Sequence, residues 1–344
     1  MYRQHVKLAR PIRAAAQEHR TRERLFLRLE HEGNVGYGEV APQPQSLHGD
    51  PSGYEVVEAV RRAITKLSEV VSREGGMPPW NHVARLSAAT SASNAAAALL
   101  EMAVLDRELR AAPCTIEALW PESYDTPRQV TFSLLGDEPE WSVEPGVERV
   151  RIKTAPGQLN RRTLERLSRL DVPILLDFNC SASVDNDVLH QVEQVSDVAT
   201  IAAVEQPYDV GDIADHARLA SRLEVPLSLD EGVRTLRDLS QIAKNAAAEV
   251  VCVKPARVGG LANARTMFAK ADELGLRAYL GGFFESPYAR RVHRALAHYC
   301  VSEPSDLDDV AVLDGSHEVD AIDVSAGLEP SAAMLAEAEV LSMA

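Results

Sequence analysis

The chain has 344 residues, of which 45% are hydrophobic and 25% charged, a balance typical of a globular protein with a sizeable core. Its 36 Lys and Arg residues against 51 Asp and Glu residues give a net charge of −15, which argues against nucleic acid or anionic lipid as a partner because their phosphates would be repelled. The four cysteines form no C-x-x-C pair, and the N-terminus has no apolar leader-like run. These features predict a cytoplasmic protein with reduced cysteines and no membrane contact.

The first part of the chain predicts an α+β domain. RLFLRLEHEGNVGYGEVAP alternates apolar and polar residues around EGN, a turn signal, and so predicts two antiparallel strands. YEVVEAVRRAITKLSEVV and SASNAAAALLEMAVLDRELRA then show apolar residues at helical spacing. Strands followed by helices indicate an α+β domain over residues 1–125, and we expect the tail, residues 320–344, to pack back on it. The arginines near the N-terminus are predicted to lie on a solvated loop or strand face; they are Arg10, Arg13, Arg20, Arg22 and Arg24.

From residue 126 to residue 319 the pattern changes to alternating strands and helices. The strand-like runs are VTFSLL, RVRIKT, PILLDFN, TIAAVEQP, VPLSLDEG, EVVCVKP and RAYLGGFFES. Amphipathic stretches lie between most of them, which indicates parallel strands with crossover helices. With a weaker eighth strand near VSEPSDL, the number is right for a closed barrel. The connection GDEPEWSVEPGVE is rich in Pro and Glu and is expected to make a poor helix.

Five ionisable residues end five successive predicted strands, one β/α unit apart. They are Lys153, Asp177, Glu205, Asp230 and Lys254. Because the carboxyl ends of barrel strands meet at one rim, where barrel active sites lie, we expect the five side chains to cluster. Each residue taken singly is more often structural than catalytic, but five in register make chance the weaker explanation.

The residue types predict a metal-assisted acid/base site. Three carboxylates on adjacent strands form an oxygen-only ligand set suited to a hard cation such as Mg²⁺. In an eight-stranded barrel, strands two and six lie opposite each other, so Lys153 and Lys254 would face each other across the metal. A lysine can act as a base where nearby cations lower its pKa, and Arg151, on the same strand face as Lys153, is one such neighbour.

Three other features have weaker interpretations. Gly259 and Gly260 either open an anion-binding helix start or only allow a turn. His293 and His298, five residues apart on a predicted helix, do not share a face and are interpreted as surface residues. The run GGFFES is typical of a strand end that can offer backbone N–H groups, at Gly282, and the hydroxyl of Ser286 to a ligand.

Together these motifs resemble the enolase superfamily, in its muconate lactonizing enzyme subgroup, over nearly the whole chain. GYGEVAP and SASNAAAALLEMAVLD resemble the capping domain, and RIK, DFN, VEQP, LDEG and VKPARVGG resemble the barrel strand motifs. The last motif, with LGGFFES after it, is most similar to o-succinylbenzoate synthases. The resemblance implies an α/β fold, a (β/α)7β TIM-like barrel with an N-terminal α+β capping domain. The chain departs from the family pattern at Arg151, where the family has a lysine, and at the helix-poor first connection.

The resemblance also implies the cofactor and the site residues. It implies Mg²⁺, for which Mn²⁺ can substitute, held by Asp177, Glu205 and Asp230. Lys153 and Lys254 would be the acid/base catalysts. The residues implied or expected to bind substrate are Arg151, Asn179, Gly282 and Ser286.

The implied reaction begins with abstraction of a proton α to a carboxylate. The first interpretation is a lyase that eliminates water from a small carboxylate substrate, like o-succinylbenzoate synthase in menaquinone biosynthesis. The alternatives are an N-acylamino acid racemase, a dipeptide epimerase or a cycloisomerase on the same scaffold, and, less favoured, a carboxylate-binding barrel without turnover. We expect the capping loops near PIRAAAQEHR and PQPQSLHGD to select the substrate. The sequence leaves open whether the protein is a monomer or a homo-oligomer.

Overall fold

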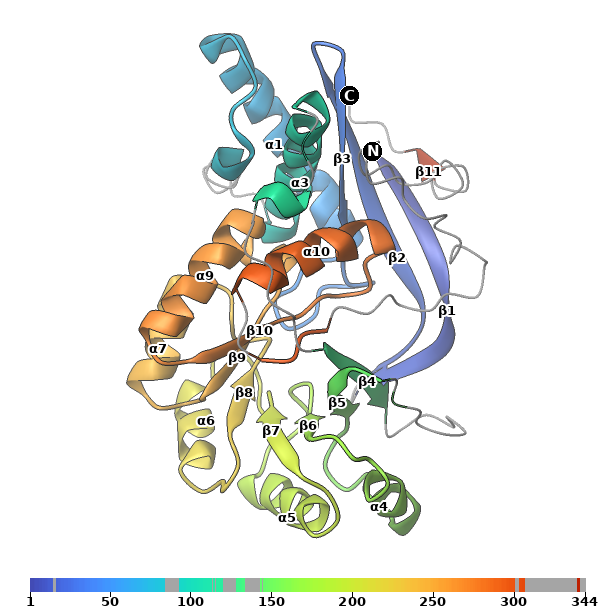
Figure 1. Cartoon of the computed structure of the whole chain (residues 1–344), viewed down its shortest axis with the longest axis vertical. Helices are drawn as coiled ribbons and strands as arrows, with labels where there is room; N and C mark the ends of the chain where they lie inside the picture. The colour runs from blue at the N-terminus through green and yellow to red at the C-terminus, as the bar shows by residue number, and fades with distance from the viewer. Residues whose placement is uncertain are drawn as a thin grey trace.

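The computed structural model describes residues 1–14, 17–83, 93–112, 114, 116–119, 128–133, 143, 145–300, 303–306 and 339–340. The N-terminal part builds a four-stranded antiparallel sheet with two helices packed beside it (Figure 1). Its elements are β1 (Tyr2–Ala14), β2 (Gln17–His31), β3 (Asn34–Val40), α1 (Gly53–Glu74), α3 (Asn94–Ala111) and β11 (Glu339–Val340). The strand order is β11-β1-β2-β3, so two residues near the C-terminus pair with the first strand.

The predicted hairpin and both predicted helices are confirmed. Strands β2 and β3 pair antiparallel and turn at Glu32 and Gly33, which both have positive φ. Strand β1 was not predicted, although Val6, Leu8 and Ile12 alternate with polar residues along it. Helix α3 lies so close to β3 that a Cβ on Gly38 would sit 2.1 Å from the carbonyl oxygen of Leu99. The small residues of α3 and the glycines of β3 therefore allow the helix and the strand to pack closely.

The second sheet has seven parallel strands in the order β10-β9-β8-β7-β6-β5-β4. The strands are β4 (Arg128–Ser133), β5 (Val147–Lys153), β6 (Ile174–Asp177), β7 (Ile201–Glu205), β8 (Leu227–Leu229), β9 (Val250–Val253) and β10 (Arg277–Leu280). The helices that follow them are α4 (Arg161–Leu167), α5 (Asp185–Ser196), α6 (Ile213–Ala220), α7 (Leu236–Lys244), α8 (Pro255–Val258), α9 (Leu261–Glu273) and α10 (Pro287–Cys300), and η1 (Ile116–Leu119) precedes β4. All seven predicted strands are thus confirmed, and Figure 1 shows the sheet curled with helices α4 to α7 and α9 outside it.

Residues 303–306 lie beside β10, where the predicted eighth strand was expected. The amide of Glu303 donates to Ala278 O at 3.2 Å, and the amide of Asp306 donates to Leu280 O at 3.0 Å. From the other side of the sheet, Arg149 of β5 contacts Glu303 at 2.9 Å. This segment therefore lies between β10, at one edge of the curled sheet, and β5, the strand next to the other edge. The fold is a (β/α)7β barrel with an N-terminal α+β capping domain, as predicted.

Some predicted features fall outside the described residues. The boundary between residues 125 and 126, most of the connection GDEPEWSVEPGVE and the boundary between residues 319 and 320 are among them. The proposed domain limits, 1–125 with 320–344 and 126–319, stay predictions. Within the described ranges, none of the helices combines the length and the apolar character needed to span a bilayer.

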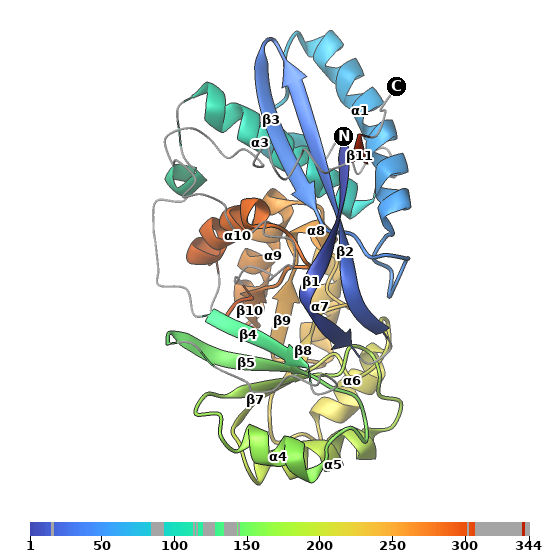
Figure 2. The ribbon, with the colours of Figure 1, turned by 90° about the vertical axis from the view of Figure 1, so that its right-hand side faces the viewer.

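The capping domain packs on the carboxyl ends of the barrel strands. The long β1–β2 hairpin reaches along the parallel sheet to β4 (Figure 2). Helix α3 packs on α8, and the side chain of Asn94 donates to Arg257 O at 2.6 Å. The rim where the five ionisable residues end their strands is thus covered by the capping domain.

This packing corrects the interpretation of the N-terminal arginines, at least for two of them. Arg22 and Arg24 are buried, with exposed fractions of 3% and 1%. Their strand, β2, has one face on α1 and α3 and turns the other toward the barrel loop at Phe284, whose carbonyl accepts a hydrogen bond from Arg24 Nε at 2.9 Å. The strand is covered on both faces at a domain contact, so these two arginines are not solvated as predicted.

Candidate active site

The five strand-end residues lie at one height of the barrel. In the sheet, Lys153 is paired in register with Asp177, and Asp177 with Glu205. Asp230 follows the last residue of β8, and Lys254 follows the last residue of β9. The common strand height predicted from the sequence therefore corresponds to one cluster in space.

Each lysine forms an ion pair with the nearer outer carboxylate. Lys153 Nζ lies 2.8 Å from Asp177 Oδ2 and donates to Asn179 Oδ1 at 2.9 Å. Lys254 Nζ lies 2.7 Å from Asp230 Oδ2. Glu205, whose strand lies between those of the two outer carboxylates, has neither lysine as a partner. The ammonium groups therefore flank a row of three carboxylates, one at each end.

Glu205 is held from inside the barrel by Arg151 and Tyr279. Arg151 Nη2 lies 3.2 Å from Glu205 Oε1 and donates to the Tyr279 hydroxyl at 2.9 Å. That hydroxyl in turn donates to Glu205 Oε2. The charge of Arg151 is thus directed at Glu205 rather than left free beside Lys153, and its predicted contact with substrate stays a prediction.

The site carboxylates are buried, and the neighbouring cations offset the effect of burial on the pKa of Asp230 but not on that of Glu205. Burial raises the pKa of Glu205 to about 8, and the charges of Asp177 and Asp230 act in the same direction, against Arg151. Burial would also raise the pKa of Asp230, but Arg257 and Lys254 hold it below its ordinary value. Burial would lower the pKa of Lys254, but Asp230 raises it.

A hard cation fits this donor set. Asp177, Glu205 and Asp230 are buried and offer only oxygen atoms. Glu205 Oε1 is buried and accepts no hydrogen bond from any described residue, although Arg151 lies nearby. A buried acceptor without a donor is costly, and a metal ion would satisfy it.

Sequence reasoning missed Arg257 and Glu231, although both lie in motifs that it used, VKPAR and LDEG. Arg257 forms an ion pair with Asp230 and another, at 2.7 Å, with Asp50 of the capping domain. Glu231 is buried, and its Oε1 accepts a hydrogen bond from Asn179 at 3.4 Å. Both are ionisable residues beside the predicted site, and this could have identified them. The burial of Arg257 between two domains leaves no periodic pattern in the sequence.

Ser286 donates its hydrogen bonds to the capping domain. Its amide donates to Glu39 of β3 at 2.7 Å, and its hydroxyl donates to the same carboxylate. Gly282 lies against the guanidinium of Arg290 and the carboxylate of Glu285. Substrate binding by Ser286 and Gly282 stays a prediction, with the hydroxyl of Ser286 already engaged.

The start of α9 does bind an anion, and that anion belongs to the chain. Glu101 of α3 accepts hydrogen bonds from the amides of Leu261 and Ala262, the latter at 3.2 Å. A Cβ on Gly260 would lie 2.1 Å from Glu101 Oε2, and Gly260 has a φ of 125°, so both space and backbone conformation require glycine. The helix start thus binds the carboxylate of Glu101 and also needs glycine for its turn, so both interpretations describe one contact between the domains.

His293 is not a surface residue. It is buried, with a 3% exposed fraction, and shares a small cavity with Glu39 and Glu285. Burial lowers its pKa to about 4. The interpretation failed because α10 is covered by the capping domain on the side that carries His293.

Residues 138–328, just over half of the chain, match the family described as enolase C-terminal domain-like. The chain belongs to the enolase superfamily. The predicted family is confirmed. The prediction of an enzyme is confirmed with it, because the relatives are lyases and racemases of this superfamily.

Full-length relatives agree with this assignment. The chain is 27% identical to an N-succinylamino acid racemase of Amycolatopsis over 85% of its length and 80% of the relative. It is 26% identical to an o-succinylbenzoate synthase of Bacillus subtilis over 86% of its length and 80% of the relative. Its fold is similar to that of a dipeptide epimerase from Cytophaga hutchinsonii complexed with Mg and a dipeptide, with a TM-score of 0.73, 16% identity, and coverage of 89% of this chain and 85% of that one.

Proposed function

We propose that this enolase-superfamily chain is a Mg²⁺-dependent lyase that removes the proton α to a carboxylate and eliminates water, as o-succinylbenzoate synthases do. The observation that carries the proposal is the row of three buried carboxylates flanked by two ion-paired lysines. Asp177, Glu205 and Asp230 would hold the ion, and Mn²⁺ would substitute for it.

A bound Mg²⁺ would supply stabilisation of the negative charge that develops on the substrate carboxylate when its α-proton leaves. Lys153 is the proposed base. Its Nζ lies 2.8 Å from Asp177, one of the carboxylates that would hold the ion, and so at the edge of the proposed metal site. Asn179, which accepts a hydrogen bond from Lys153, would keep the amine in place.

The proton balance of a dehydration fits one base. Lys153 takes the α-proton, the carbon–hydroxyl bond at the β-carbon breaks as the double bond forms, and the leaving hydroxyl needs one proton to become water. Lys153, now an ammonium, can return the proton that it took. Lys254 stays protonated beside Asp230 and stabilises the developing charge from the other side.

The buried cation Arg22 supports a substrate with a second acidic group. Its Nε has no hydrogen-bond partner and it forms no ion pair with a carboxylate among the described residues; its contacts are Gln43 at 3.2 Å, His19 at 3.5 Å and the ring of Phe284 at 3.7 Å. Burial lowers the pKa of Arg22 to about 9. His19 is close enough to Lys153 for that charge to act on it, so Arg22 lies on the side of the cap that faces the lysine. The charge of Glu285 acts on Arg22 without an ion pair, and a succinyl carboxylate would supply a counter-charge in direct contact.

One observation favours a second candidate, a racemase of N-succinylamino acids. Lys254 is a second amine at the opposite end of the carboxylate row, as a reaction on two faces of one carbon requires. The relative with that printed name matches most of the chain. We further propose that the enzyme works in the cytoplasm on small molecules, in menaquinone biosynthesis if it is the synthase.

The test combines proton exchange with product analysis. The Mg²⁺-loaded enzyme would be incubated in D₂O with the precursor of o-succinylbenzoate, with N-succinylamino acids and with dipeptides. We expect α-deuteration and dehydration of the first, and Arg22→Met should raise KM for succinyl substrates without the same effect on dipeptides. Absence of α-deuteration in the whole panel would refute proton abstraction from these substrate classes.

A further inference from the structure

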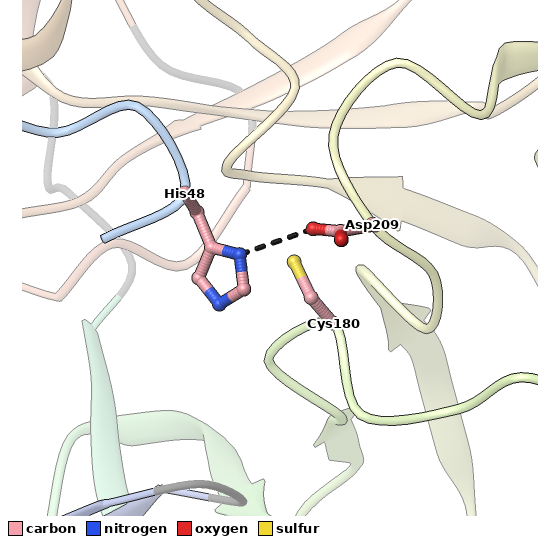
Figure 3. A group of neighbouring side chains, drawn as sticks. All are labelled: His48, Cys180 and Asp209. Carbon is pink, nitrogen blue, oxygen red and sulfur yellow. Dashed lines mark hydrogen bonds and ion pairs between the residues drawn. The ribbon is translucent and has the colours of Figure 1, made fainter. Parts of the chain in front are cut away.

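Three loops bring His48, Cys180 and Asp209 together at the edge of the barrel (Figure 3). His48 comes from the loop between β3 and α1, Cys180 from the loop after β6, and Asp209 from the loop after β7. One nitrogen, one sulfur and one oxygen atom of the three side chains all lie within 4.8 Å of one another, and His48 Nδ1 lies 3.1 Å from Asp209 Oδ1. In Figure 3 the sulfur of Cys180 points toward the pair formed by the other two.

We propose that His48, Cys180 and Asp209 form a second metal site that binds a divalent ion of the Zn²⁺ class. Imidazole, thiolate and carboxylate are the ligands that Zn²⁺ takes, whereas Mg²⁺ prefers oxygen ligands alone. Metal–ligand bonds of about 2.0–2.3 Å in a tetrahedron put ligand atoms about 3.3–3.8 Å apart. His48 Nδ1 and Asp209 Oδ1, at 3.1 Å, are near that spacing, and all three ligand atoms lie within 4.8 Å of one another. Three protein ligands leave the fourth position open to water.

The backbone already holds two of the three ligands. The amide of Cys180 donates to Gln206 O at 2.8 Å, and the carbonyl of His48 accepts a hydrogen bond from Arg234. Both ligands have left-handed backbone conformations, with φ of 60° for Cys180 and 47° for His48, which are uncommon outside glycine. Asp209 has a side chain that is 70% exposed, and its Oδ1, which faces His48, accepts a hydrogen bond from the amide of Val210 at 3.1 Å.

The local charge favours a cation. Burial raises the pKa of the Cys180 thiol, and the charges of Glu231, Asp209 and Asp177 add to the effect. The same negative field attracts a divalent ion, whose binding would release the thiol proton to solvent. This site differs from the strand-end site in ligand type, and it does not depend on the proposed reaction.

An ion here would tie the capping domain to the barrel. His48 belongs to residues 42–50, which contribute Asp50 to the ion pair with Arg257, whereas Cys180 and Asp209 belong to barrel loops. A bound ion would therefore cross-link the capping loop to two barrel loops next to the strand-end residues.

Cobalt absorption tests the proposal on the full chain with excess Mg²⁺ present. We expect wild-type protein to bind Co²⁺ with a thiolate-to-cobalt charge-transfer band and the strong visible bands of tetrahedral cobalt. Cys180→Ser should lose the charge-transfer band. His48→Gln and Asp209→Asn should weaken Co²⁺ binding by at least the roughly 10- to 100-fold that even an outer-shell partner is worth. Cys114→Ser, which changes another half-buried cysteine outside the site, is the matched control and should keep the band.

A second readout separates binding from folding. Zn²⁺ should slow amide exchange in residues 42–50 of the wild type and of Cys114→Ser, but not of Cys180→Ser, and circular dichroism would show that the variants are folded. A wild type without a thiolate band, or a Cys180→Ser variant that keeps it, would overturn the proposal. Cobalt bound only at the strand-end carboxylates would give no thiolate band and would count against it too.

Discussion

Neutralising Asp50 should detach the capping loop from the active site. Asp50 is buried and accepts hydrogen bonds from Arg257 Nε at 3.0 Å and Nη2 at 2.7 Å. Arg234 lies 3.1 Å from the same carboxylate. Asp50→Asn keeps the shape of the side chain but removes the charge that both guanidinium groups share.

The expected loss of docking free energy depends on which partners Arg257 and Arg234 keep in the variant. Breaking one partner of a buried ion pair costs about 3–5 kcal/mol, because the other charge stays buried without compensation. Arg257 keeps Asp230 as a partner and Arg234 is partly exposed, so the loss belongs at the low end, about 3 kcal/mol. That corresponds to roughly a hundredfold weaker docking of residues 42–50.

Amide hydrogen exchange of the loop measures this directly. The amide of Asp50 donates to Leu47 O at 2.8 Å, so it reports on whether the loop is formed. We expect exchange in residues 42–50 to accelerate by about two orders of magnitude in Asp50→Asn. Asp171→Asn, at an exposed aspartate of the barrel, is the matched control and should leave exchange unchanged. If Asp50→Asn exchanged within threefold of the wild type, the ion pair would not be what holds the loop.

Three further predictions concern the site and its surroundings. Asp230→Asn should weaken Mg²⁺ binding, measured by calorimetry, with an unchanged circular dichroism spectrum; wild-type activity after exhaustive chelation would contradict the metal requirement. Lys153→Ala should abolish α-proton exchange in D₂O, whereas Lys254→Arg, which cannot readily deprotonate, should keep some dehydration but no racemisation; near wild-type rates in both would remove the lysines from the chemistry. His293, with a pKa lowered from 6.5 to about 4, contributes stability that is present above pH 6.5 and lost as pH falls toward 4, about 3 kcal/mol in total. Urea unfolding should therefore show a weaker pH dependence in that window for His293→Gln, and identical slopes would refute the assignment.

The strand-end cluster could be predicted from the sequence because every step was local. A buried parallel strand reads as a short apolar run, and the first ionisable residue after it lies at the carboxyl end whatever the packing outside. Lys153, Asp177 and Glu205 could thus be placed at one height without knowing which helices cover them, and the sheet register agrees.

Contacts between the two domains could not be predicted in this way. Arg24, Arg257 and His293 are buried only because capping and barrel segments far apart in the sequence meet on them. Taken alone, each element shows these residues as the polar side of an amphipathic pattern. Periodicity reports which face of an element is apolar, but a polar face that a second domain covers has the same pattern as a solvated one.

Arg151 shows why the departure from the family pattern involves more than one strand. A lysine there would present a single point of charge, whereas the planar guanidinium reaches Glu205 and Tyr279 together. Tyr279, on β10, donates to the other oxygen of Glu205 and lies under the guanidinium of Arg149, 4.7 Å from its ring centre. The arginine on β5 and the tyrosine on β10 therefore orient the central carboxylate together. Arg151 therefore contacts Glu205, whereas the side chains that contact Lys153 are those of Asp177 and Asn179.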